Sequence, residues 1–415
     1  MGDVDPNDIH QGLSTGYFCS ALSCAAENPK IIERLFVTKE YNEEGVYKIR
    51  LCKNGQWVVV TVDDYIPCYP DGGPCFAKTS SPNMWVTLLQ KAFAKLVGNY
   101  HLLNGISFQS VMRDMTGCPT EFHQWEDTED IDYDEIWEKI VTQSESGHLI
   151  VAGTKIFANY GKEDKRAHSG GLFGGHTYTV VKAIQYEGYR LLNLRNPFGK
   201  DDKGNSVGEW NGDWSDTSEL WEDVPHIKEV MQPVFDLYDG NFWMSLEDFL
   251  SHFDTVGACK VEELFECRLK GKFLKVYEKK VKERDWVLSK FFYKLNVPEH
   301  SGDSVPVTIG IHQEDEADFA VRETRPYMDV GCVVLRQEDG ELTFQGMHEP
   351  ARERDVETTF DLEPGDYIIV PRTSGGYFST PPGLKLWSHL EHYSVDENGV
   401  TIVNPLIRSM LNNIF

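Results

Sequence analysis

Hydrophobic and polar positions follow distinct patterns along the first hundred residues. Residues 17–27 are small and apolar throughout, which is typical of a helix buried on all sides, and Asn28-Pro29 would end it. Residues 85–97 carry apolar side chains at helical spacing, which predicts an amphipathic helix with Asn83 as its cap. Residues 46–51 and 56–62 alternate in polarity around Asn54-Gly55, which predicts a β-hairpin.

A second alternating region follows the glycine-rich loop 170–175. The segment that begins at His176 alternates up to a turn signal at Glu187-Gly188, and the next apolar run ends at Asn196. A hairpin here would bring His176, at the entry of one strand, beside Asn196, at the exit of the next. A histidine base oriented by an asparagine is the arrangement that a cysteine protease uses. An isolated histidine on a strand is more often an ordinary, partly buried residue, but the preceding glycines allow the close approach of a ligand.

Beyond about residue 262 the pattern changes to strands alone. Alternating segments separated by turn residues predict an antiparallel β-sandwich; they lie at 287–297, 306–312, 331–336, 342–345 and 366–371. Acidic runs at 314–316 and 349–357 are expected to be loops, either solvated or cation-binding. The acidic run 126–138 is expected to be a solvated linker or helix face.

Composition limits the partners of the 415-residue chain. It holds 40 Lys and Arg against 66 Asp and Glu, a formal charge of −26, which disfavours nucleic acid and any membrane that calcium does not bridge. Its nine cysteines show no metal-binding spacing, and its polar start resembles no secretion signal. No apolar run is long enough to span a bilayer. We therefore expect a cytoplasmic protein with reduced thiols and protein or peptide partners, in an oligomeric state that the sequence does not specify.

Several ordered motifs together resemble one known family. They lie at 8–12, 174–180, 194–199, 209–216, 239–245, 313–315 and 362–371. In this order they resemble the calpain family of papain-like cysteine proteases, over nearly the whole chain. The resemblance implies an α+β fold, with a papain-like core of two subdomains followed by an antiparallel β-sandwich. The expected bounds are 1–122 for the helical subdomain, 123–262 for the β-rich subdomain, 263–375 for the sandwich and 376–415 for a C-terminal tail.

The resemblance also implies roles for four residues. Gln11 matches the glutamine that stabilises the oxyanion, His176 the general base, Asn196 its orienting partner, and Trp210 the tryptophan packed beside that asparagine. The alternative is that these four residues are retained only because they pack in the core, and not because they bind a peptide.

The nucleophile position departs from the family pattern. The family has Gln-Gly, two variable residues and then Gly-Asp-Cys, whereas Gln11-Gly12 is followed here by Leu-Ser-Thr-Gly-Tyr-Phe-Cys. Alignment on residues 20–23 places Gly16 at the nucleophile, and alignment on Gln11-Gly12 places Tyr17 there. Cys19 is the alternative nucleophile, but it lies about 4.5 Å further along a helix than Gly16 and within an apolar run. Reacting atoms must approach to about 3–3.5 Å.

The resemblance further implies calcium ligands in the core. Asp8 and Asp239 match carboxylate ligands of the family, whereas Asn83 and Asn241 stand where the family generally has glutamate. Calcium prefers several charged oxygen ligands. We therefore expect calcium binding in the core to be weak or lost.

These observations favour a calpain-like protein that has lost peptidase chemistry and acts as a regulatory or scaffolding protein. The alternative is an active calcium-dependent cysteine endopeptidase that uses Cys19 for limited intracellular proteolysis. A membrane-binding module built on the β-sandwich is a third hypothesis, which the charge of −26 disfavours.

Overall fold

A computed structural model of the chain forms two compact units. One contains residues 1–53 and 57–263, and the other contains residues 54–56 and 264–415. The finer bounds expected at residues 122 and 375 stay predictions. The structure describes residues 2–13, 16–70, 72–79, 81–104, 106–125, 132–156, 168–197, 208–236, 239–262, 265–270, 287–288, 292–313, 327 and 330–373. The acidic run at 314–316 and the predicted tail lie outside the described residues.

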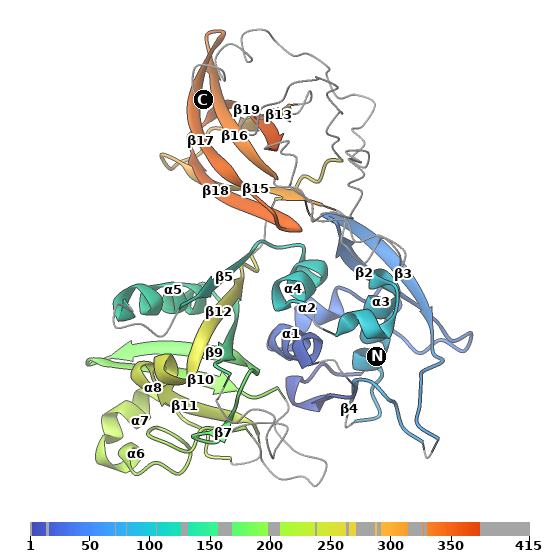
Figure 1. Ribbon diagram of the computed structural model, residues 1–415, viewed down its shortest axis with the longest axis vertical. Coiled ribbons are helices and arrows are strands. Elements are labelled where there is room, and N and C mark those ends of the chain that lie inside the picture. Colours follow the sequence, from blue (N-terminus) through green and yellow to red (C-terminus); the bar gives the residue numbers. More distant parts are fainter. Residues whose placement is uncertain are drawn as a thin grey trace, which may run out of the picture. The chain divides into compact units, whose positions relative to one another are not determined.

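The N-terminal part of the first unit is mainly helical (Figure 1). The predicted buried helix, β-hairpin and amphipathic helix are all present in it. The apolar run forms a helix, α1, that is buried from Phe18 to Ala26, whereas the predicted cap of α3 is wrong. Met84 takes the N-cap position, because the Asn83 amide instead donates to the Asp3 carbonyl oxygen over 3.3 Å. The elements are η1 (Pro6–Asp8), β1 (Ile9–His10), α1 (Gly16–Ala26), α2 (Pro29–Glu33), β2 (Val46–Lys53), β3 (Gln56–Asp63), β4 (Lys78–Thr79), α3 (Trp85–Val97), η2 (Tyr100–Leu103) and α4 (Phe108–Thr116).

The back of the same unit is a six-stranded antiparallel sheet. Its strand order is β11-β10-β9-β6-β12-β5, and the predicted hairpin forms its β9–β10 pair, with Glu187 and Gly188 in the turn at positive φ. The elements are β5 (Thr120–Gln124), α5 (Tyr133–Glu145), β6 (Leu149–Thr154), β7 (His168–Ser169), β8 (Leu172–Phe173), β9 (Thr177–Tyr186), β10 (Tyr189–Arg195), α6 (Leu220–Asp223), α7 (Pro225–Met231), β11 (Asn241–Ser245), α8 (Leu246–His252) and β12 (Phe253–Cys259).

Helix α1 connects the two parts of this unit. It packs against α4 and α2 on the helical side and against β9 and β6 of the sheet (Figure 1). The sheet has its own core, in which α5 contributes Trp137 and α8 contributes Phe249. All its side chains from Phe18 to Ala26 are buried, including the small polar Ser20 and Ser23, so this stretch of α1 has no solvent-exposed face.

The second unit is β-rich, as the alternating pattern predicts. A sheet in the order β13-β19-β16-β17, with β14 also paired to β19, faces the pair β15–β18 across a core that includes Val334 and Leu362. The strands are β13 (Val287–Leu288), β14 (Tyr293–Val297), β15 (Val305–His312), β16 (Val330–Glu338), β17 (Glu341–Ala351), β18 (Asp355–Leu362) and β19 (Gly365–Thr373).

One expectation for this unit is wrong. Residues 349–357 are not a loop but belong largely to β17 and β18. A strand accommodates the buried Asp355 because its carboxylate accepts from His312 Nδ1 at 2.7 Å and from Arg354 Nε at 2.5 Å. Pairing of this kind offsets the cost of removing a carboxylate from water.

None of the helices in the described part of the chain combines the length and the apolar character needed to cross a membrane.

Candidate functional site

A histidine and an asparagine meet at one end of the β9–β10 hairpin. His176 directly precedes β9, Asn196 directly follows β10, and His176 Nε2 lies 3.0 Å from Asn196 Oδ1. An amide oxygen only accepts, so the hydrogen bond places the imidazole proton on Nε2 and leaves Nδ1 as the basic nitrogen of the neutral ring. This is the pairing that the sequence predicts.

Backbone and side-chain contacts fix the position of His176. Its backbone N–H donates to Thr154 Oγ1 at 2.9 Å, and its carbonyl oxygen accepts from the Thr154 N–H at 2.8 Å. Its ring is edge-on to Phe173 and Tyr178, with centroids 5.6 and 5.0 Å away. The imidazole is therefore held between a strand and two aromatic rings, with only partial exposure to solvent.

Asn196 is held more tightly, since it is only 2% exposed. Its backbone N–H donates to the Gly240 carbonyl at 2.9 Å, and the Gly240 N–H donates to Glu209 Oε1 at 3.0 Å. Gly208, at φ +74°, lies so close that a Cβ atom there would be 2.6 Å from Asn196 Nδ2. The chain around residues 208–209 thus encloses the asparagine.

Trp210 packs on the glycine-rich loop that precedes His176. A Cβ atom on Gly170 would lie 2.2 Å from the Trp210 ring, so a glycine is required there. The indole Nε1 donates to the Asp213 carbonyl at 2.7 Å, and the ring is edge-on to His252 at 5.0 Å. Trp210 is buried in the core of the sheet, which also contains Leu194 from the strand before Asn196.

The first residue of α1, Gly16, faces Gln11. A Cβ atom on Gly16 would lie 3.5 Å from Gln11 Nε2, and no other atom of the described residues lies within 4 Å of it beyond the backbone of its own helix and its chain neighbours. The Ser20 hydroxyl is within hydrogen-bonding distance of both the Gly16 carbonyl, at 3.0 Å, and the Thr177 carbonyl, at 3.4 Å. Thr177 follows His176, so one hydroxyl links the start of α1 to the histidine strand.

The other two candidates for the nucleophile differ sharply in exposure. Cys19 is fully buried within α1, with an exposed fraction of 0%, whereas Tyr17 is 48% exposed. A thiol that water does not reach offers no surface to a peptide substrate. A phenol has an ordinary pKa of about 10 and is a poor nucleophile near neutral pH.

The assembled groups provide two of the three parts that acyl transfer needs. An oriented base is formed by His176 and Asn196, and an amide donor near the start of a helix is provided by Gln11. The third part is an activated nucleophile, and Gly16 cannot provide it because glycine has no side chain that could form a covalent bond to a carbonyl carbon.

The residues proposed as calcium ligands form two separate pairs. Both oxygens of the Asp8 carboxylate accept from Ser81, which also neighbours Asn83, and Asp239 Oδ1 accepts from the Asn241 N–H at 2.8 Å. Within the described ranges, no three His, Cys, Asp or Glu side chains gather in a way that would hold a metal. Since calcium takes about six to eight oxygen ligands, many of them carboxylates, the Asp8 and Asn83 pair does not fit the ion.

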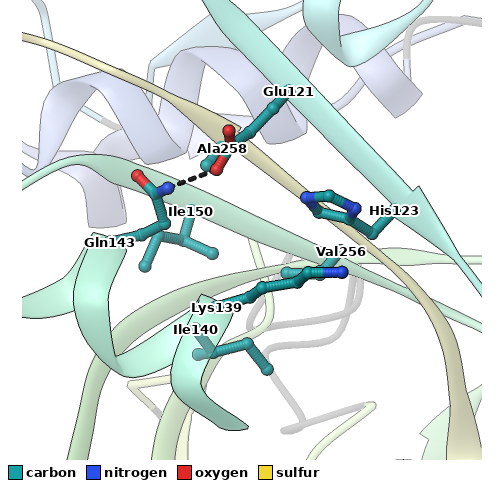
Figure 2. A pocket seen from close by; sticks show the side chains of 8 residues that line it. All are labelled: Glu121, His123, Lys139, Ile140, Gln143, Ile150, Val256 and Ala258. Carbon is teal, nitrogen blue, oxygen red and sulfur yellow. Dashed lines mark hydrogen bonds between the residues drawn. The ribbon is translucent and has the colours of Figure 1, made fainter. Parts of the chain in front are cut away.

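A small pocket lies elsewhere in the first unit, under α5 (Figure 2). Apolar side chains such as Ile140 and Val256 form its floor, while Glu121, His123 and Lys139 line it with polar groups. Glu121 is already hydrogen-bonded to Gln143 and paired with Lys260. The pocket contains none of the candidate site residues.

Several residues that shape the site gave no clear signal in the sequence. Thr154 contacts His176 across 22 positions, and Ser20 contacts Thr177 across 157 positions. Gly208 contacts Asn196 from outside the hairpin that carries the asparagine.

Comparisons with known proteins agree with the geometry. A sequence profile described as "calpain family cysteine protease" matches residues 1–260. The chain is 37% identical over 265 residues to calpain-type cysteine protease DEK1 of Arabidopsis thaliana, covering 63% of this chain and 12% of that protein. It is 29% identical over 409 residues to calpain-9 of Mus musculus, covering 90% and 57%, and 27% identical over 435 residues to calpain-9 of Homo sapiens, covering 96% and 61%. The chain thus spans less than two thirds of the length of these relatives.

Proposed function

Because this chain belongs to the calpain family of cysteine proteases, we propose that it is a member without peptidase activity that acts as a regulatory or scaffolding protein. The proposal rests on one observation. The residue that faces Gln11 at the start of α1 is Gly16, which carries no side chain to attack a peptide bond.

The surrounding frame supports a retained binding cleft. His176 and Asn196 keep a hydrogen bond of 3.0 Å, and Ser20 keeps the start of α1 close to the histidine strand. A frame of this kind holds an extended peptide without cleaving it. Protein or peptide partners in a reducing, cytoplasmic compartment are therefore the partners that we propose.

The alternative is an active endopeptidase that uses Cys19. This side chain is fully buried, and it lies one helical turn inside the position that faces Gln11. To attack a substrate, its sulfur would have to approach the carbonyl carbon to about 3–3.5 Å, which requires α1 to unwind at its start.

Hydrolysis of casein by the full chain tests the proposal. The assay compares the unmodified protein with Cys19→Ala, in millimolar calcium and reducing agent. We expect no hydrolysis by either protein, although both are folded by circular dichroism. Hydrolysis that is abolished in Cys19→Ala would overturn the proposal and identify Cys19 as the nucleophile.

A binding measurement tests the scaffold function itself. Fluorescently labelled, denatured casein serves as the extended-peptide probe, and its anisotropy is followed on titration with the protein. We expect saturable binding that Tyr17→Asp weakens several-fold, because this residue is half-exposed beside Gly16. Equal binding by both proteins would place the peptide outside the cleft.

A further inference from the structure

The N-terminal segment is fastened to the 78–83 segment by hydrogen bonds. Strand β1 pairs with β4, so that Ile9 lies opposite Thr79. Asn83 Nδ2 donates to the Asp3 carbonyl oxygen at 3.3 Å. Between these contacts lies Asp8, which is only 7% exposed.

Ser81 occupies both oxygens of the Asp8 carboxylate. Its backbone N–H donates to Oδ1 at 2.7 Å, and its hydroxyl donates to Oδ2. Both carboxylate oxygens thus accept hydrogen bonds from one residue of the protein itself. We call this pair of bonds the Asp8–Ser81 latch.

The side-chain amide of the neighbouring Asn83 also contacts the protein itself rather than being free to bind a cation. A Cβ atom on Gly2 would lie 1.7 Å from Asn83 Oδ1, so the amide oxygen packs directly against the backbone of Gly2. Together with the bond to Asp3, this contact fixes both ends of the Asn83 amide on the N-terminal segment. Asp8 and Asn83 are therefore engaged by the protein itself.

We infer that the Asp8–Ser81 latch takes the place of a calcium ion in this half of the core. Asp8 lies three residues before Gln11, and only β1 separates the two residues. By holding β1 against β4, it fixes the segment that presents Gln11 to Gly16. The helical half of the core thus takes up its arrangement without the metal, whether or not the chain cleaves peptides.

Thermal unfolding of the full chain, with calcium or with a chelator, tests this inference. We expect the melting temperature of the unmodified protein to be the same in both, since a ligand stabilises only a state that binds it. Ser81→Ala should lower the melting temperature by roughly 3–6 °C, because it removes a bond to a charged, buried group. Ser251→Ala, which removes an exposed serine hydroxyl from α8, is the matched control and should change it little.

A second variant tests directly whether the Asp8–Ser81 latch takes the place of calcium. Ser81→Ala combined with Asn83→Glu frees one Asp8 oxygen and adds a carboxylate, so calcium should raise its melting temperature by about 5 °C, and magnesium should not. Three results would overturn the inference: a calcium-dependent rise in the unmodified protein that Asp8→Asn abolishes, a Ser81→Ala variant as stable as Ser251→Ala, or a double variant that does not respond to calcium. The readout is thermal, so a failure here is separate from a failure of the proposed function.

Discussion

The side-chain nitrogen of Gln11 lies 3.5 Å from the point where a Cβ atom would project from Gly16. Among the described residues, no other atom lies within 4 Å of that point, beyond the backbone of its own helix and its chain neighbours. A small side chain therefore fits at position 16, opposite Gln11.

Gly16→Cys should create a reactive thiol. A cysteine at a helix start near a histidine base has a lowered pKa, so its thiolate attacks alkylating agents near neutral pH. We expect iodoacetamide at pH 6.5 to label it at least about tenfold faster than the exposed Cys68. Mass spectrometry of the labelled peptides gives both rates.

The matched control is Gly16→Cys combined with His176→Ala, in which the rate should fall to that of Cys68. Equal rates for position 16 with and without His176 would contradict the geometry, because His176 would then lie too far away to act as a base.

An ion pair joins the end of α1 to the histidine sheet. Glu27 contacts Arg195, which is buried, and burial lowers the pKa of this guanidinium to about 10. Glu27→Gln removes the carboxylate in contact with this buried charge and leaves only the more distant Asp5 and Asp239 to offset it, so we expect the free energy of unfolding in urea to fall by about 2 kcal/mol. Glu135→Gln removes an exposed pair with Lys139 and should cost less than about 0.5 kcal/mol. Similar losses for the two variants would contradict a structural role for the buried pair.

Gly208 is the position where the chain closes over Asn196. It has φ +74°, and a Cβ atom there would lie 2.6 Å from both Asn196 Nδ2 and the Phe173 ring. Gly208→Ala should therefore lower the free energy of unfolding by roughly 2–3 kcal/mol and displace the asparagine from His176. The loss is measured by urea unfolding, and the displacement by the imidazole resonances of His176.

Gly188→Ala is the matched control for Gly208→Ala. Gly188 has a similar φ of +88°, but no atom of the described residues lies within 4 Å of its Cβ position. It shares the backbone penalty without the crowding, so the difference between the two variants measures the crowding alone. No difference would mean that residue 208 does not press on the asparagine.

Elements defined by neighbouring residues were predictable from the sequence. The hairpin that brings His176 to Asn196 follows from alternation on both sides of one turn, so its register is set locally. The buried helix α1 follows in the same way from an unbroken apolar run. The family motifs added the roles of Gln11 and Trp210, which no periodicity reveals.

Contacts between distant residues were not predictable. Asp8 and Ser81 are 73 positions apart, and nothing in their local sequence indicates that they meet. Strand β18 was missed for a related reason, because charged residues near Asp355 resemble a solvated loop until their partners are known. Pairing across the fold, rather than local propensity, decides such positions.

The thiol of Cys24 makes stability depend on alkaline pH. Burial, and then the nearby Cys259, raises the pKa of Cys24 to about 12 from 9.0. Below pH 9 the thiol is neutral in both the folded and the unfolded chain, so its contribution is fully present. Above pH 9 only the unfolded chain ionises, and the contribution is lost as the pH rises toward 12.

At pH 10 the loss of stability from Cys24 should be about 1.4 kcal/mol relative to pH 8. The difference in unfolding free energy between the unmodified protein and Cys24→Ala, measured in urea with reducing agent at both values of pH, should shrink by this amount. The exposed Cys267 provides the control, because Cys267→Ala should leave the pH dependence unchanged. A difference that stays constant from pH 8 to pH 10 would show that Cys24 ionises as readily in the folded chain as in the unfolded one.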